Sequence, residues 1–200
     1  RLFRPQLHFT REMSYMKNHS RETIILFFSL FLVMVGFGII IPILPFFVTR
    51  LNGNATALGF LMASYSLMQF FFAPFWGRLS DRIGRRPVLL IGLSGYGITF
   101  ILFGLSTQLW MLFSARILSG IISSATLPTA MAYISDITAS KDRAGGMGTM
   151  GAAMGLGMIF GPALGGWLGH YSFSLPFFVA GGLAILTLPI AWFFQKEALK

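Results

Sequence analysis

Several residue types that support enzyme chemistry are absent or scarce in this chain of 200 residues. There is no cysteine, which excludes disulfides, thiolate metal sites and cysteine nucleophiles. The three histidines are scattered at His8, His19 and His170, so no metal-ligand cluster is expected. Because the apolar segments also contain no nucleophile–base pair, we expect neither a cofactor nor an enzymatic activity.

Charged residues are also scarce, at 10% of the chain, whereas 55% of the residues are hydrophobic. A soluble domain of this size needs more charge to cover its surface, so the composition indicates a polytopic membrane protein. The formal net charge is nevertheless +9. In a soluble protein this charge would suggest nucleic acid as a partner. Here the basic residues lie beside apolar runs, which favours a role in membrane topology and predicts no nucleic-acid partner.

Long uncharged runs dominate the chain, and about 20 apolar residues are enough to cross the roughly 30 Å of bilayer hydrocarbon. The runs are Thr23 to Thr49, Leu51 to Gly77, Pro87 to Ala115, Ile117 to Ser135 and Ala144 to Gln195. A polar turn at residues 106–108 ends the third span, and residues 170–174 divide the last run into two. We therefore expect an all-α protein with six transmembrane helices.

These spans predict three segments along the chain. Residues 1–22 are expected to form a cytoplasmic tail, residues 23–195 the six-helix domain, and residues 196–200 the start of a cytoplasmic loop. Because the chain starts with Arg1, the tail is expected to include a non-native start, with Met16 as a plausible initiation residue.

The basic residues segregate to one side of the six predicted spans. The side that holds both termini has Arg1, Arg4, Arg11, Lys17, Arg21, Arg78, Arg82, Arg85, Arg86, Lys141, Arg143, Lys196 and Lys200. The opposite side has only Arg50. Because an excess of Lys and Arg in short loops marks the cytoplasmic face, both termini are predicted to be cytoplasmic in the cell membrane.

A weak internal repeat favours a three-plus-three arrangement of the spans. Gly77, Leu79 and Pro87 recur as Gly166, Leu168 and Pro176, at a constant offset of 89 residues. The first set follows the second span and the second set follows the fifth, so the two sets are expected on opposite faces. An inverted-topology repeat would leave this pattern, although three matches in a glycine-rich chain can also arise by chance.

The turn between the second and third spans has the strongest charge pattern. Asp81 and Arg85 are four residues apart and share a face if the segment is helical. Asp136 and Asp142 flank the next turn on the same side and offer Arg85 a second carboxylate. The turn can simply set orientation and contact lipid headgroups. Alternatively, it can form an ionic lock that opens and closes as the bundle moves.

Arg116 is the only ionisable residue deep within a predicted span. Burying an arginine at the centre of a bilayer costs at least ~2.5–3.5 kcal/mol, so its side chain is expected to face a polar cavity or to extend outward to the interface. Tyr65 and Gln69 on another span could share that cavity. No Asp or Glu lies inside any predicted span, so a proton-carrying carboxylate would lie outside this sequence, or Asp81 and Asp136 would serve.

Glycine and proline mark the fifth and first spans. Gly157, Gly161 and Gly165 recur every fourth residue, which places them on one helical face and predicts close packing against another helix. In the first span, Pro42 and Pro45 each remove a backbone donor and are expected to kink or break the helix near its outer end.

These motifs together resemble the amino-terminal half of a major facilitator superfamily transporter. The segment Gly77 to Arg86 matches that superfamily's G-x-L-x-D-R-x-G-R-R/K signature at every fixed position, and Arg116 with Gly120 resembles its fourth-helix signature. A fifth-helix signature typical of drug–proton antiporters is matched by Gly157, Gly161, Pro162, Gly165 and Gly166. The prolines that follow Gly36 and Gly38 fit the twelve-helix branch with tetracycline and multidrug exporters.

The resemblance implies roles for these residues. The cytoplasmic conformational lock would comprise Gly77, Asp81, Arg82, Gly84, Arg85, Arg86 and Asp136. Arg116 would take part in proton coupling or its electrostatic control, with Tyr65 and Gln69 in the same cavity. Gly161 and Pro162 would shape the interface along which the fifth helix moves.

The implied function is efflux of drugs or other small lipophilic solutes by proton antiport and alternating access. Transporters of this family have two six-helix halves, so the chain would need a missing carboxy-terminal half or a second copy. Two alternatives stay open: uptake of a sugar or other nutrient, and a non-transporting fragment or membrane assembly partner. The fifth-helix pattern weighs against uptake.

Overall fold

The structure is a computed structural model that describes residues 5–138 and 142–194. Within these ranges every regular element is a helix. The elements are α1 (Pro5–Arg50), α2 (Ala55–Ile83), α3 (Arg85–Gly104), α4 (Leu109–Ile122), the 3-10 helix η1 (Ser123–Ala125), α5 (Thr126–Ile137), α6 (Arg143–Gly169) and α7 (Leu175–Phe194). The predicted loop at residues 196–200 lies outside the described residues, as does Lys141.

Six helical segments are long and apolar enough to cross a membrane, which confirms the predicted number of spans. They are Thr23–Arg50, Ala55–Ile83, Arg85–Gly104, Leu109–Ile137, Arg143–Gly169 and Leu175–Phe193. The first of these is part of a longer helix, because α1 begins at Pro5 and continues without interruption into the span.

The fourth span contains an interruption that the sequence analysis did not anticipate. Between α4 and α5 the backbone tightens into η1 for three residues. Pro128 lacks the N–H that would bond to the Ser124 carbonyl. Two serines also bond back to the preceding turn, since Ser123 Oγ donates to the Ser119 carbonyl and Ser124 Oγ donates to the Ile121 carbonyl at 2.8 Å. Such back-bonding serines often bend helices.

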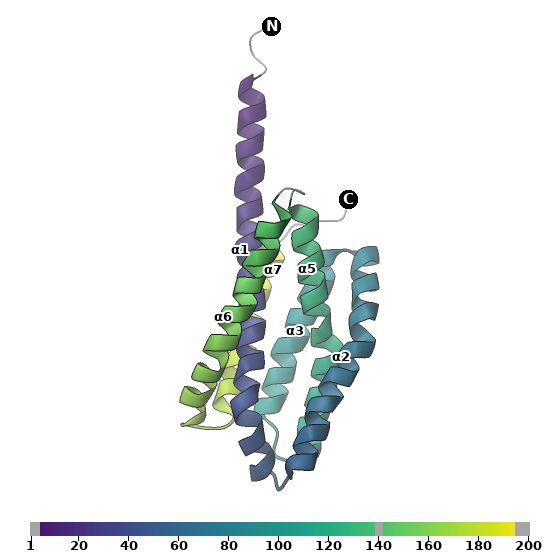
Figure 1. Cartoon of the computed structure of the whole chain (residues 1–200), viewed down its shortest axis with the longest axis vertical. Coiled ribbons are helices and arrows are strands. Elements are labelled where there is room, and N and C mark those ends of the chain that lie inside the picture. Colours follow the sequence, from purple (N-terminus) through teal and green to yellow (C-terminus); the bar gives the residue numbers. More distant parts are fainter. Residues whose placement is uncertain (1–4, 139–141, 195–200) are drawn as a thin grey trace.

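The six spans pack in a pattern that agrees with an inverted repeat. The most extensive pairings are α1 with α6, α3 with α7, and α2 with α4, and Figure 1 shows the spans side by side as one bundle. An inverted repeat makes span one equivalent to span four, span two to span five, and span three to span six. Under this equivalence the contact of α1 with α6 corresponds to the contact of α4 with α2, and the contact of α3 with α7 corresponds to itself. The packing therefore supports the predicted three-plus-three arrangement.

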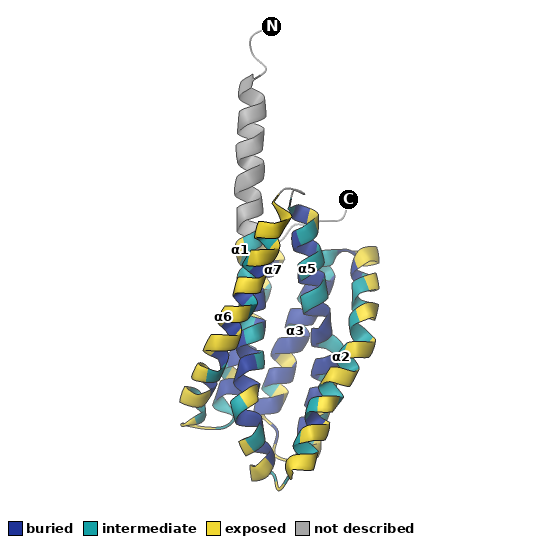
Figure 2. Ribbon diagram, viewed as in Figure 1, coloured by how far each residue is buried: buried dark blue, intermediate teal, exposed yellow. Residues whose placement is uncertain are grey.

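Burial is uneven among the helices, as Figure 2 shows. α3 buries most of its residues, whereas α2 buries almost none and α6 only a few. Stacked aromatic rings fill the interface between α3 and α7, where Phe103 and Phe177 have ring centroids 5.5 Å apart. The helices α2 and α6 therefore present large apolar faces to whatever surrounds the bundle.

The two prolines of the first span do not break its helix. α1 stays helical through both Pro42 and Pro45, and the Pro45 carbonyl accepts a hydrogen bond from Thr49 Oγ1 at 3.0 Å. Membrane helices tolerate proline when side chains or neighbouring helices satisfy the freed backbone groups. The helix therefore does not break at these prolines, and the kink expected as the alternative stays a prediction.

Candidate functional site

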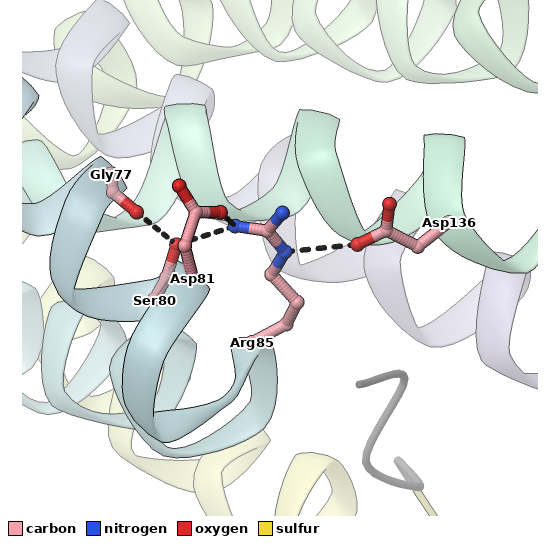
Figure 3. A network of polar contacts seen from close by, with 5 residues as sticks. All are labelled: Gly77, Ser80, Asp81, Arg85 and Asp136. Carbon is pink, nitrogen blue, oxygen red and sulfur yellow. Dashed lines mark hydrogen bonds and ion pairs between the residues drawn. The ribbon is translucent and has the colours of Figure 1, made fainter. Parts of the chain in front are cut away.

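Three helices meet at the charged turn between α2 and α3 and form the group of polar residues drawn in Figure 3. We call this group the charge cluster. It contains Gly77, Ser80, Asp81, Arg85 and Asp136. The first three lie in the last turns of α2, Arg85 is the first residue of α3, and Asp136 lies near the end of α5.

Arg85 is the centre of the charge cluster. Its Nε donates to Asp136 Oδ2 at 2.9 Å and its Nη1 donates to Ser80 Oγ at 2.8 Å. Nη1 also forms an ion pair with Asp81 Oδ1. Ser80 Oγ in turn donates to the Gly77 carbonyl at 2.8 Å. One guanidinium thus ties α2, α3 and α5 together, using the planar fork of donors that distinguishes arginine from lysine.

Burial of the charge cluster differs between the cation and its partners. The Arg85 side chain is only 12% exposed, whereas the side chains of Asp81 and Asp136 are 61% and 37% exposed. A buried cation needs partners that replace its lost hydration. Because both carboxylates keep contact with solvent, each can separate from Arg85 without being stranded in hydrocarbon.

The remaining residues of the predicted lock have different surroundings. Gly84 alone joins α2 to α3 and has φ 107° and ψ 155°, a conformation that residues with a side chain rarely adopt. Arg82 is exposed. Arg86 turns away from the charge cluster and donates through Nη2 to the carbonyl of Trp192 in α7. The segment Gly77 to Arg86 therefore takes part in two separate contacts, one with α5 through Arg85 and one with α7 through Arg86.

Arg116 of α4 lies inside the bundle and is only 2% exposed. Its guanidinium carbon lies 4.4 Å from the centroid of the Tyr65 ring, and its Nη2 is 3.3 Å from the sulfur of Met62. Both neighbours are on α2, three residues apart and therefore on one face. Arg116 is held by an aromatic face and a thioether and does not extend outward to the interface.

The bonding of Arg116 is incomplete within the described part of the chain. Its Nε and Nη1 are buried and have no hydrogen-bond partner there. No described carboxylate accepts from it, since Asp81 and Asp136 are paired with Arg85 at the helix ends. Gln69 lies one turn beyond Tyr65 on α2, but no hydrogen bond joins it to Arg116 among the described residues. The structure thus brings Tyr65, but not Gln69, into contact with Arg116.

The glycines of the fifth span pack α6 against α1. A Cβ atom at Gly161 would lie 2.5 Å from the Val35 carbonyl oxygen and 2.7 Å from Gly38 Cα. Gly157 and Gly165 meet α1 in the same way one turn before and after, next to Phe31 and Ile39. These contacts agree with the predicted close packing.

Two residues of the fifth-helix signature lie at the edge of this contact. Pro162 Cδ would be 2.9 Å from a Cβ atom at Gly38, so the proline ring packs on α1. Gly166 faces open space, with no atom within 4 Å of its Cβ position. Gly166 therefore takes no part in packing within the described chain.

Three contact residues were missed from the sequence. Ser80 was not singled out, although its place between Gly77 and Asp81 puts its hydroxyl beside Arg85. Met62 was overlooked because a thioether carries no charge. Trp76 donates through Nε1 to the Ile121 carbonyl at 2.6 Å, next to the interruption of the fourth span. The sequence feature that could have indicated this contact is an aromatic residue with an N–H donor in an otherwise apolar run, since a buried indole usually has a hydrogen-bond partner.

Comparison with known proteins gives a consistent result. Multidrug resistance protein 2 of Bacillus subtilis is 34% identical over 88% of this chain and 44% of its own length. The class C tetracycline resistance protein of Escherichia coli is 43% identical over 83% of this chain and 42% of its own length. The chain thus spans less than half the length of these curated relatives.

Solved structures with a similar fold are also transporters. A human organic anion transporter matches 91% of this chain and 49% of its own, with a TM-score of 0.77 and 26% sequence identity. A bacterial homologue of the human lysosomal transporter Spinster matches 90% of this chain and 43% of its own, with a TM-score of 0.82. At 17% identity the second match shows the fold alone.

A family profile covers most of the chain. It matches residues 26–200 and represents the Major Facilitator Superfamily. The charge cluster, the buried arginine and the α1–α6 contact all lie within this range. The chain therefore belongs to the Major Facilitator Superfamily.

Proposed function

We propose that the chain is the amino-terminal half of a secondary active transporter that exports drugs or other small lipophilic solutes. Export proceeds by alternating access and is driven by proton antiport. The names of the relatives support this proposal, since both those quoted above are resistance proteins for drugs or tetracycline.

Buried Arg116 is the observation that carries the proposal. An arginine with unpartnered N–H groups inside a membrane domain is costly unless an anionic group meets it during the working cycle. Within the described spans no carboxylate is placed to do so. The anionic partner is therefore a carboxylate of the second half, and its protonation would weaken its attraction to Arg116. This exchange couples proton binding to the position of α4.

The charge cluster supplies the second element of the mechanism. Arg85 holds the ends of α2, α3 and α5 together while its carboxylate partners remain partly exposed. Breaking the pair with Asp136 releases α5 from the α2–α3 turn at that end of the bundle. In an alternating-access cycle such a contact closes in one state and opens in the other. We place this end at the cytoplasmic face because of its arginines.

The partner of this half would cover the exposed faces of α2 and α6. On α2 the exposed face includes a groove of about 830 Å³. It is lined by Phe60, Ala63, Ser64, Ser66, Leu67, Phe70 and Phe113. The chain spans less than half the length of its curated relatives, so a second six-helix half is the expected partner. A second copy of the chain is the alternative.

A transport assay tests the proposal. Bacteria that lack their main drug exporters would make the chain alone, or the chain joined to the second half of Bacillus subtilis multidrug resistance protein 2. We expect the joined protein to lower the accumulation of a fluorescent lipophilic cation, and collapse of the proton gradient or Arg116→Ala to abolish the effect. Arg143→Gln, at an exposed position outside the site, is the matched control. Export by neither form would contradict the proposal.

A further inference from the structure

An apolar groove runs between α3 and α7, beginning at the end of the bundle where the charged turn lies. Its volume is about 570 Å³, within the roughly 300–1,000 Å³ typical of ligand sites. The lining residues are Pro87, Leu90, Ile91, Ser94, Leu188, Pro189, Trp192 and Phe193. Ser94 is the only one with a polar side chain apart from the indole N–H of Trp192, so the groove suits a hydrocarbon chain.

Arg86 lies at the mouth of this groove. Its guanidinium carbon is 4.9 Å from the centroid of the Trp192 ring, and its Nη2 donates to the Trp192 carbonyl. These contacts hold Arg86 over the aromatic residue that lines the groove.

The guanidinium of Arg86 has hydrogen-bonding capacity to spare. Arginine carries five N–H donors, and the Trp192 carbonyl is the one acceptor found for them in residues 5–138 and 142–194. Nε is buried and has no hydrogen-bond partner there, so an external group would meet Nη1 and Nη2 instead. A planar cation with free donors matches a phosphate group, which can accept two parallel hydrogen bonds from it.

We propose that the α3–α7 groove binds an anionic phospholipid from the leaflet in contact with the charged turns. One acyl chain lies in the groove, and the phosphate accepts hydrogen bonds from Arg86. This inference does not depend on transport activity.

The surroundings favour a lipid over a protein segment. Trp192 and Arg86 lie together at one end of the spans, and tryptophan and arginine are both enriched where a bilayer meets water. The turn itself carries Arg78, Arg82, Arg85 and Arg86 against one carboxylate, Asp81. This excess of positive charge attracts anionic headgroups, and basic pockets between membrane helices are known to bind them.

Native mass spectrometry of the full 200-residue chain in detergent micelles tests the proposal, because it measures the affinity for each lipid. The probes are phosphatidylglycerol and phosphatidylcholine with identical acyl chains. We expect about fivefold tighter binding of phosphatidylglycerol, equivalent to about 1 kcal/mol for one basic residue near an anionic surface. Arg86→Gln should abolish this preference, whereas Arg86→Lys should retain part of it. Arg143→Gln, which removes an exposed arginine outside this turn, should leave the preference intact.

A fluorescence measurement locates the acyl chain. With phenylalanine at the other three tryptophan positions, only Trp192 emits, and lipids brominated on the acyl chain should quench it. Ser94→Phe fills the groove and should reduce quenching by both lipids. Equal affinity for the two lipids in the parent chain would overturn the proposal. A preference that survives Arg86→Gln, or quenching unaffected by Ser94→Phe, would overturn it as well.

Discussion

Arg85 at the start of α3 donates through Nε to Asp136 Oδ2 near the end of α5, at 2.9 Å. The two residues are 51 positions apart in the sequence, and this bond is the part of the charge cluster that reaches beyond the α2–α3 turn. Breaking it would leave Arg85 paired with Asp81 and Ser80 on its own side. The Arg85–Asp136 contact is therefore the point at which the charge cluster can open.

Replacing Asp136 and replacing Arg85 should lower the free energy of unfolding by different amounts. Asp136→Asn should reduce the free energy of unfolding by up to about 1 kcal/mol, as for a partly exposed ion pair. Arg85→Gln should cost about 1–3 kcal/mol because it leaves several polar partners unsatisfied. Thermal unfolding of the purified chain in micelles, followed by circular dichroism, measures both. Arg82→Gln is the matched control and should change stability little. Equal effects of all three substitutions would contradict the geometry.

Two glycines of the same signature should respond in opposite ways to alanine. Gly84→Ala should cost about 1–3 kcal/mol, because φ 107° is strained for a residue with a side chain. Gly77→Ala places a methyl group in open space within a helix and should leave stability unchanged or raise it by up to about 1 kcal/mol. Thermal unfolding distinguishes the two. A stable Gly84→Ala variant would show that the turn has another backbone conformation.

The α1–α6 contact should not accept an added methyl group. Gly161→Ala would press a Cβ atom against the backbone of Val35 and Gly38, and overpacking of this kind costs about 1–3 kcal/mol. Gly155→Ala lies on the same helix with no atom near its Cβ position and serves as the control. The same unfolding measurement applies. If both variants unfold alike, α1 and α6 do not meet at these glycines.

Replacement of Arg116 should separate stability from transport. Arg116→Met removes a buried cation with two unsatisfied donor atoms and should stabilise the chain by about 1–3 kcal/mol. For a protein of this size that is roughly 2–4 °C in Tm per kcal/mol. Transport by the completed protein should be lost. Arg116→Lys keeps the charge but loses the stacking on Tyr65. A destabilised Arg116→Met chain would indicate that Arg116 already has a partner.

Much of the fold could be predicted from the sequence because membrane physics acts on whole segments. Apolar runs of sufficient length predicted six spans, and the glycine spacing of residues 157–165 predicted a close helix contact. Motifs in a fixed order predicted the family, and the family profile over residues 26–200 confirms it. These predictions depend on the composition of whole segments and on the spacing of residues along a helix. They require no knowledge of individual side-chain contacts.

The features that the sequence left undecided or did not predict are local. The helix continues through Pro42 and Pro45, so of the two outcomes expected there the break does not occur and the kink stays a prediction. The interruption at η1 arises where serine back-bonding coincides with Pro128, a combination that hydropathy does not register. Tyr65 contacts Arg116, whereas a polar cavity shared with Gln69 stays a prediction.

Labelling of single cysteines is the most direct test of the account's central claim, that a six-span bundle keeps its charged turns at the cytoplasmic face. The chain contains no cysteine, so Ala55→Cys and Ala144→Cys are matched reporters at exposed alanines near the starts of α2 and α6. In intact cells a maleimide that cannot cross the bilayer should label the Ala55→Cys variant but not the Ala144→Cys variant. After the cells are lysed, it should label both variants. Labelling of Ala144→Cys in intact cells would contradict the account.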